Sequence, residues 1–220
     1  MLKATMSPMT EDNPDLDRSL FDPLPESPLP TLARWFEDAR KVPSVRNHDA
    51  MVLATVDAEA RPSVRMVLCR AIDFERARFA FYTDRTSPKA RQLETSGRAS
   101  AVFHWDPLAR QVRISGPVKR ASEADSDDYF ARRSPAAQLA AWTSQQSRPI
   151  SSRDELEERF AKVEERFQGG PVPRPADWGG YVITAESIEL WVSREGRLHD
   201  RALWTYEPTR GTWRVERLQP

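Results

Sequence analysis

Hydrophobic and polar residues along this chain alternate in short blocks that are typical of β-strands. Five blocks bounded by turn residues occupy 51–56, 63–72, 78–83, 100–105 and 110–118, and more strand-like blocks follow residue 178. Apolar residues at every second position give a strand one buried and one exposed face. Several short strands at this spacing favour an antiparallel barrel over a parallel sheet, whose strands alternate with helices.

Helical spacing appears in the remaining parts of the chain. Over 30–42, the apolar residues Leu32, Trp35, Phe36 and Ala39 lie on one face of a helix. A short helix is predicted over 89–95, and three more lie between 123 and about 168, one of them capped by Ser134. The predicted fold class is therefore mainly β with helices (α+β), an antiparallel β-barrel with surrounding helices.

Domain organisation follows from composition. Residues 1–29 are rich in Pro, Asp and Ser, so we predict that they are disordered or only loosely docked. Residues 30–220 contain no repeat, no low-complexity block and no shift of composition. We therefore expect a single domain over 30–220.

Charge and cysteine content narrow the possible functions. Lys and Arg number 33, as do Asp and Glu, so the net charge is zero. A neutral chain lacks the basic field of nucleic-acid binders and of electrostatic membrane anchors. No apolar run approaches the ~20 residues of a membrane span, and the first residues contain no hydrophobic signal segment. With one cysteine, Cys69, the sequence predicts a cytoplasmic protein that binds neither nucleic acid nor membrane.

Motifs for metal or nucleophilic catalysis are missing from the sequence. The three histidines, His48, His104 and His199, have no ligand spacing, and there is no paired-cysteine motif. No nucleophile elbow, P-loop or dinucleotide fingerprint occurs. We therefore predict no metal site.

Features that suit anions do recur along the chain. The segment 81–92 reads as a strand, a Ser/Thr-rich turn and a helix start, where Lys89 and free N–H groups favour a phosphate. Arg65 and Arg70 lie at the two ends of an apolar strand, where a charge needs a partner or a ligand. Gln146 and Ser147 follow a helix. Taken singly, the segment 81–92 is better explained as an ordinary capped helix, and a polar loop would look the same as Gln146 and Ser147.

Two further patterns place cationic and aromatic groups together. In RLHDR (197–201), an extended chain would put Arg197, His199 and Arg201 on one face. A solvated strand edge is the plainer interpretation of that pattern. Tyr129 and Arg133 are four residues apart at a helix end and could form a phosphate pocket, or a solvated surface.

In combination these residues resemble the pyridoxine (pyridoxamine) 5′-phosphate oxidase family. The matching pieces extend from about Leu32 to Pro220 and include FYTDRTSPKARQLE, FHWDPLARQVRISGPVKR, YFARRSPAAQLAAWTSQQS, WGGY and IELWVSREGRLHDR. The resemblance implies an FMN-binding split barrel and a homodimer with active sites at the subunit interface. It also implies oxidation of pyridoxine or pyridoxamine 5′-phosphate to pyridoxal 5′-phosphate, with O2 as the electron acceptor.

The resemblance also assigns expected roles to individual residues. Residues that match the family's FMN contacts are Arg65, Arg70, Tyr82, Thr83, Lys89, Gln111, Gln146, Ser147, Trp191 and Arg201. Residues that match its substrate contacts are Arg70, Tyr129, Arg133, Ala137, Arg197 and His199, of which Arg197 and His199 are the expected catalytic pair.

The chain departs from the family pattern at several positions. Arg70 stands where a Lys is usual, Ala137 where a Ser is usual, and Pro88 where an Arg is usual. The N-terminal segment lacks the family's substrate-covering Arg/Tyr motif. Two alternatives therefore stay open: a sibling flavin oxidase of the phenazine-biosynthesis type, and a protein that binds FMN or pyridoxal phosphate without catalysis.

Overall fold

A computed structural model describes residues 22–220, so most of the prediction for residues 1–29 lies outside the described residues. Where the description begins, Leu24 packs against the core, and the carbonyl of Pro25 accepts a hydrogen bond of 2.9 Å from the indole of Trp204. No helix of residues 22–220 is long and apolar enough to cross a membrane.

The observed elements follow the predicted blocks closely. The helices are α1 (Leu29–Lys41), α2 (Pro88–Ser96), α3 (Glu123–Ala131), α4 (Pro135–Thr143) and α5 (Arg153–Phe167). The strands are β1 (Ala50–Val56), β2 (Pro62–Asp73), β3 (Arg78–Asp84), β4 (Arg98–Trp105), β5 (Arg110–Arg120), β6 (Trp178–Thr184), β7 (Ser187–Val192), β8 (Asp200–Glu207) and β9 (Thr212–Leu218). Short 3₁₀ turns cover Asp106–Leu108 and Glu195–Arg197.

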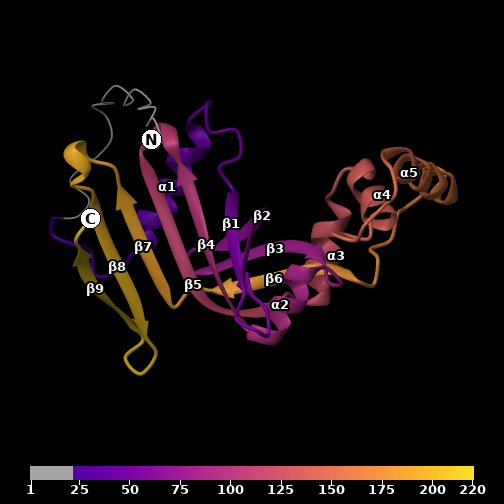
Figure 1. Ribbon diagram of the computed structural model, residues 1–220. Coiled ribbons are helices and arrows are strands. Elements are labelled where there is room, and N and C mark those ends of the chain that lie inside the picture. The colour runs from indigo at the N-terminus through magenta and orange to yellow at the C-terminus, as the bar shows by residue number, and fades with distance from the viewer. Residues whose placement is uncertain (1–21) are drawn as a thin grey trace, which may run out of the picture.

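Six of the strands close into the predicted antiparallel barrel. The sheet order is β4-β1-β2-β3-β6-β5-β7-β8-β9, and an additional pairing of β4 with β5 completes the ring. Strands β7, β8 and β9 continue from β5 as an extension, on the left of Figure 1, while α4 and α5 project on the opposite side. The mainly β fold with surrounding helices is confirmed.

Strand β5 makes this split arrangement possible because it changes partner along its length. Residues 110–115 pair with β7, whereas residues 118–120 pair with β6. Gly116 lies between the two stretches, and a Cβ atom there would approach the carbonyl oxygen of Thr184 to 2.0 Å. Only glycine permits that close backbone approach.

The core fills the barrel and the space under α1. Alternating residues of β1, β3 and β4 point inward, which is the period-two pattern that the sequence predicts. Phe36 of α1 packs edge-on against Phe103 and Trp105, with ring centroids 4.8 and 4.9 Å apart. Arg110 pairs with Asp38 at 2.7 Å and so joins α1 to β5.

Candidate functional site: a cationic pocket on the barrel

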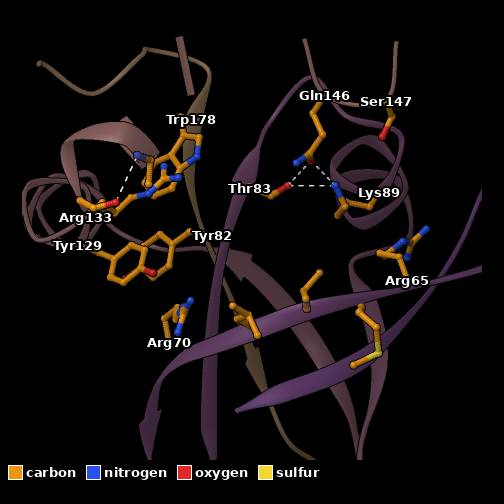
Figure 2. Close-up of a pocket in the computed structure, with 15 residues that line it drawn as sticks. Arg65, Arg70, Tyr82, Thr83, Lys89, Tyr129, Arg133, Gln146, Ser147 and Trp178 are labelled. Atoms are coloured by element: carbon orange, nitrogen blue, oxygen red, sulfur yellow. Dashed lines mark hydrogen bonds between the residues drawn. The ribbon is translucent and has the colours of Figure 1, made fainter. Parts of the chain in front are cut away.

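A pocket of about 640 Å³ opens on the side of the barrel, between β2, β3 and the segment that carries α3 and α4. Its volume lies in the range of small-molecule sites, roughly 300–1,000 Å³. The predicted site residues that line this cationic pocket are Arg65, Arg70, Tyr82, Thr83, Lys89, Tyr129, Arg133, Ala137, Gln146 and Ser147. Figure 2 shows them around one cavity, although they come from segments more than 80 residues apart.

One end of the pocket is formed by Arg65 and Lys89, which we call the first cationic pole (Figure 2, right). The ammonium of Lys89 donates to Thr83 Oγ1 at 3.1 Å and also to the amide oxygen of Gln146. Arg65 donates to Thr55 Oγ1 at 2.6 Å and to Ser63 Oγ at 2.7 Å. These neutral partners hold both cations in place without neutralising them.

Burial affects the charges at this pole. Lys89 is only 8% exposed, and that desolvation, followed by the positive charge of Arg65, lowers its pKa to about 8. Desolvation also lowers the pKa of Arg65, although a guanidinium stays protonated in proteins. An anion bound between the two cations would relieve this unfavourable arrangement.

The other end of the pocket is formed by Arg70 and Arg133 together with aromatic rings, and we call it the second cationic pole (Figure 2, left). Arg70 pairs with Asp49 at 2.7 Å, and both side chains are partly exposed. The guanidinium carbon of Arg133 lies 4.7 Å from the ring centre of Trp178. Its Nη1 atom is buried and has no hydrogen-bond partner.

The pocket cations differ from the arginines around them in having few acidic partners. Among residues 22–220, no carboxylate lies within ion-pair distance of Arg65, Lys89 or Arg133. Elsewhere, buried guanidinium groups such as those of Arg85 and Arg110 are paired with acids. Because an unpaired buried charge is costly, this pattern indicates a site for anionic ligands at two separate points.

The start of α4 contributes its backbone to the second pole. Ser134 caps the helix, and its Oγ accepts a hydrogen bond of 3.4 Å from the N–H of Ala137. Both residues line the pocket. A long bond of this kind leaves the positive end of the helix dipole available to an anion.

The remaining predicted residues lie outside this pocket, in a group that we call the C-terminal cluster: Gln111, Trp191, Arg197, His199 and Arg201. Gln111, Trp191 and Arg201 are direct cross-strand neighbours on β5, β7 and β8. The ring of His199 lies 4.7 Å from that of Trp191, and Arg201 pairs with the buried Glu189 at 2.9 Å. A single subunit therefore presents two separate groups of site residues.

The prediction of an extended chain through RLHDR is wrong. Arg197 ends the 3₁₀ turn Glu195–Arg197 with a φ of +62°, and β8 begins only at Asp200. Arg197 is exposed, whereas Nδ1 of the half-buried His199 accepts a hydrogen bond of 3.1 Å from the N–H of Arg194. Alternation of charge in five residues cannot distinguish a strand from a turn that precedes one, because both place polar groups in solvent.

Trp178 and Ser134 line the pocket although the sequence did not assign them to it. Trp178 begins β6, as the first residue of the WGGY motif. A polar helix cap and a strand-initial tryptophan are ordinary structural features, so only the turn-rich segment before WGGY could have suggested a site.

A closed antiparallel barrel with a three-strand extension defines a split-barrel protein, and a cationic pocket lies on its flank. Residues 38–167 match the family described as "Pyridoxamine 5′-phosphate oxidase", and residues 178–220 match "Pyridoxine 5′-phosphate oxidase C-terminal dimerisation region". The chain therefore belongs to the pyridoxamine 5′-phosphate oxidase family.

Individual relatives support the same assignment. A pyridoxine/pyridoxamine 5′-phosphate oxidase of Rubrobacter xylanophilus is 45% identical, over 98% of this chain and 93% of the relative. One from Gluconobacter oxydans is 44% identical, over 93% of this chain and 99% of the relative. The crystal structure of PhzG from Burkholderia lata, in complex with tetrahydrophenazine-1-carboxylic acid, superposes with a TM-score of 0.85 at 30% identity, covering 94% and 98% of the two chains.

Proposed function

We propose that this chain is an FMN-dependent oxidase that converts pyridoxamine or pyridoxine 5′-phosphate to pyridoxal 5′-phosphate, with O2 as acceptor and H2O2 as the second product. The observation that carries the proposal is a pocket with two cationic poles, in which Arg65, Lys89 and Arg133 have no carboxylate partner among residues 22–220. A phosphorylated cofactor and a phosphorylated substrate supply the two missing anions. The family relatives at 40–45% identity support this choice of ligands.

The first pole fits the phosphate of FMN. Arg65 and Lys89 supply charge, while Thr83, Gln146 and Ser147 supply neutral hydrogen-bonding groups around it. Charge-assisted bonds of this type are about twice as strong as neutral ones. When bound, FMN accepts the electrons removed from the substrate and passes them to O2. The chain itself orients the two ligands and excludes water from between them.

The second pole fits the phosphate of the substrate. Arg133 has a buried N–H without a partner, Tyr129 lies beside it, and α4 begins there. The methyl group at Ala137 offers no hydroxyl, so the backbone and Ser134 are the polar groups that α4 contributes. Arg70 belongs to the same pole, and we propose that it contacts both the substrate and the flavin.

A homodimer would unite the two groups of site residues. The matched dimerisation region supports the homodimer itself. We propose further that the C-terminal cluster of one subunit completes the cationic pocket of the other, with Arg197 and His199 over the pyridine ring. Val64 and Met66 of β2 are 66% and 61% exposed, and Met66 lines the pocket, so an apolar surface adjoins the site where a second subunit would pack.

We further place the enzyme in the cytoplasm. The thiol of Cys69 is buried, and burial raises its pKa to about 12, so it stays inert there.

A phenazine-type oxidase is the second candidate, because PhzG has the same fold at 30% identity. Incubation of the purified protein with pyridoxamine 5′-phosphate in air should separate the candidates. We expect pyridoxal 5′-phosphate and one equivalent of peroxide. Bound flavin without turnover of either phosphate ester would support a sibling oxidase or a storage protein, and would reject the proposed reaction.

Affinity for FMN should depend on pH through Lys89. The pKa of about 8 in the ligand-free protein means that Lys89 loses its proton above that pH, so FMN affinity should fall, approaching tenfold per pH unit. Keeping the buried Lys89 charged also destabilises the folded protein. Because its folded-state pKa lies below the ordinary value of 10.5, this destabilisation is fully present below pH 8 and is relieved as the pH rises toward 10.5. Flavin fluorescence titrations between about pH 7 and 9.5 measure the slope. Lys89→Met should bind FMN more weakly and with no such slope; an identical slope in that variant would exclude Lys89 as its cause.

A further inference from the structure

Three aromatic rings and one guanidinium form a layered group at the second pole. The rings of Tyr82 and Tyr129 stack 4.1 Å apart at 16°, and the ring of Trp178 lies 5.6 Å from that of Tyr82 at 9°. Arg133 lies over the face of Trp178 and within 5.5 Å of the ring centre of Phe130. Figure 2 shows Trp178 beside Arg133 at the pocket wall, with the two tyrosines below.

Backbone geometry fixes Tyr82 within this group. Gly180 is the cross-strand neighbour of Tyr82, and a Cβ atom there would lie 2.8 Å from the tyrosine ring. Without a side chain at position 180, the ring of Tyr82 can lie flat toward β6, where Trp178 projects from the same face two residues earlier.

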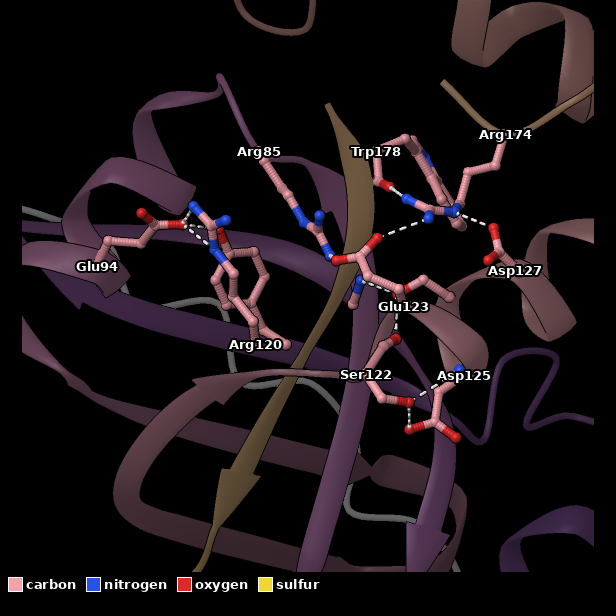
Figure 3. Close-up of polar contacts among 12 residues, drawn as sticks. Arg85, Glu94, Arg120, Ser122, Glu123, Asp125, Asp127, Arg174 and Trp178 are labelled. Carbon is pink, nitrogen blue, oxygen red and sulfur yellow. Dashed lines mark hydrogen bonds and ion pairs between the residues drawn. The ribbon is translucent and has the colours of Figure 1, made fainter. Parts of the chain in front are cut away.

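Arg174 ties the tryptophan to the helix that leads into Arg133. Its guanidinium donates to the carbonyl of Trp178 at 2.6 Å and pairs with Glu123 at 2.6 Å and Asp127 at 2.7 Å, both on α3 (Figure 3). The side chain of Arg174 is only 11% exposed. Arg174 thus sets the position of Trp178, the first residue of β6, relative to α3. This helix carries Tyr129 and ends two residues before Arg133.

We infer that Trp178 is a positioning residue that holds the Arg133 guanidinium flat so that its edge faces the substrate phosphate, and that Arg174 maintains this arrangement. The inference rests on the proposed function. A guanidinium donates hydrogen bonds only in its plane, so a ring against its face leaves every donor free. In agreement with this geometry, the Nη1 atom of Arg133 is buried and has no hydrogen-bond partner. The desolvated ring face also stabilises the positive charge, which no carboxylate pairs in the described chain.

The expected result is a defect that is confined to the phosphate. Trp178→Leu should raise KM for pyridoxamine 5′-phosphate roughly tenfold, with kcat and FMN affinity little changed, whereas Trp178→Phe should retain part of the wild-type affinity. Calorimetry with 4-deoxypyridoxine 5′-phosphate, which cannot be oxidised at C4′, should show the same loss. Unphosphorylated 4-deoxypyridoxine should bind both proteins equally.

A double-mutant cycle tests the mechanism. In an Arg133→Met background, Trp178→Leu should weaken binding no further, because the group that it positions is gone. Additive losses would overturn the inference. Arg174→Met should reproduce the defect, while Arg120→Met, which removes an arginine that pairs with Glu94 of α2 instead of the acids of α3 (Figure 3), should not. Melting curves verify that each variant is folded.

These outcomes separate failure of the inference from failure of the proposed function. If the phosphate analogue binds no more tightly to the wild-type protein than its unphosphorylated counterpart, the pocket does not hold that phosphate, and the proposed function fails. If the wild-type protein prefers the phosphate and Trp178→Leu keeps that preference in full, only the role of Trp178 is rejected.

Discussion

Two variants that are each nearly inactive, Arg133→Met and Arg197→Met, are expected to regain activity when they share a dimer. Arg133 lines the cationic pocket, whereas Arg197 belongs to the C-terminal cluster and does not line it. If each site combines the pocket of one subunit with the cluster of its partner, a mixed dimer contains one site with both wild-type halves. Random assortment should therefore restore about one quarter of the wild-type activity.

Differently tagged subunits are co-expressed, and purification through both tags isolates the mixed dimers. These should have about one half of the wild-type activity, because one of their two sites is intact. Arg197→Met alone should lower kcat/KM by roughly 10²-fold or more while FMN stays bound, since a charge positioned for the transition state is lost. Arg201→Met should instead weaken FMN retention. The matched control pairs Arg133→Met with Lys89→Met, both in the cationic pocket, and should regain nothing. Mixed dimers of Arg133→Met and Arg197→Met that stay inactive would show that the site does not cross subunits.

Removal of the Arg65 charge should abolish most of the preference for FMN over riboflavin. The guanidinium of Arg65 is held by Thr55 and Ser63 and has no carboxylate partner within residues 22–220. A hydrogen bond to a charged group contributes about 1.5–3 kcal/mol, so Arg65→Met should weaken FMN binding roughly 10- to 100-fold. Riboflavin lacks the phosphate, and its affinity should hardly change.

Fluorescence quenching of the two flavins, titrated into flavin-free protein, gives both affinities. Arg98→Met is the matched control, because Arg98 is an exposed arginine on β4 that pairs with Glu186 at 2.7 Å. It should leave the ratio of the two affinities unchanged. Equal loss for FMN and riboflavin in Arg65→Met would mean that Arg65 supports the fold of the site rather than the phosphate.

The sequence by itself determined the elements and the kind of site. Period-two burial in β1, β3 and β4, and the helix face of Leu32 and Trp35, are local patterns that backbone geometry imposes. Motif order was sufficient to choose the family, and the family matches confirm it. Lys89 and Arg133 were predicted to contact phosphates because the family resemblance selected them, and charged residues beside a helix start are compatible with anion binding.

The tertiary structure decided which of those residues meet. Pairing of β4 with β5 closes the barrel, and the change of partner at Gly116 splits it, although both depend on contacts distant in sequence. Only long-range packing brings Trp178 against Arg133 and leaves the guanidinium unpaired. The same packing makes Arg197 part of a turn instead of a strand. Burial and charge pairing are properties of neighbours in space, so no local pattern could specify them.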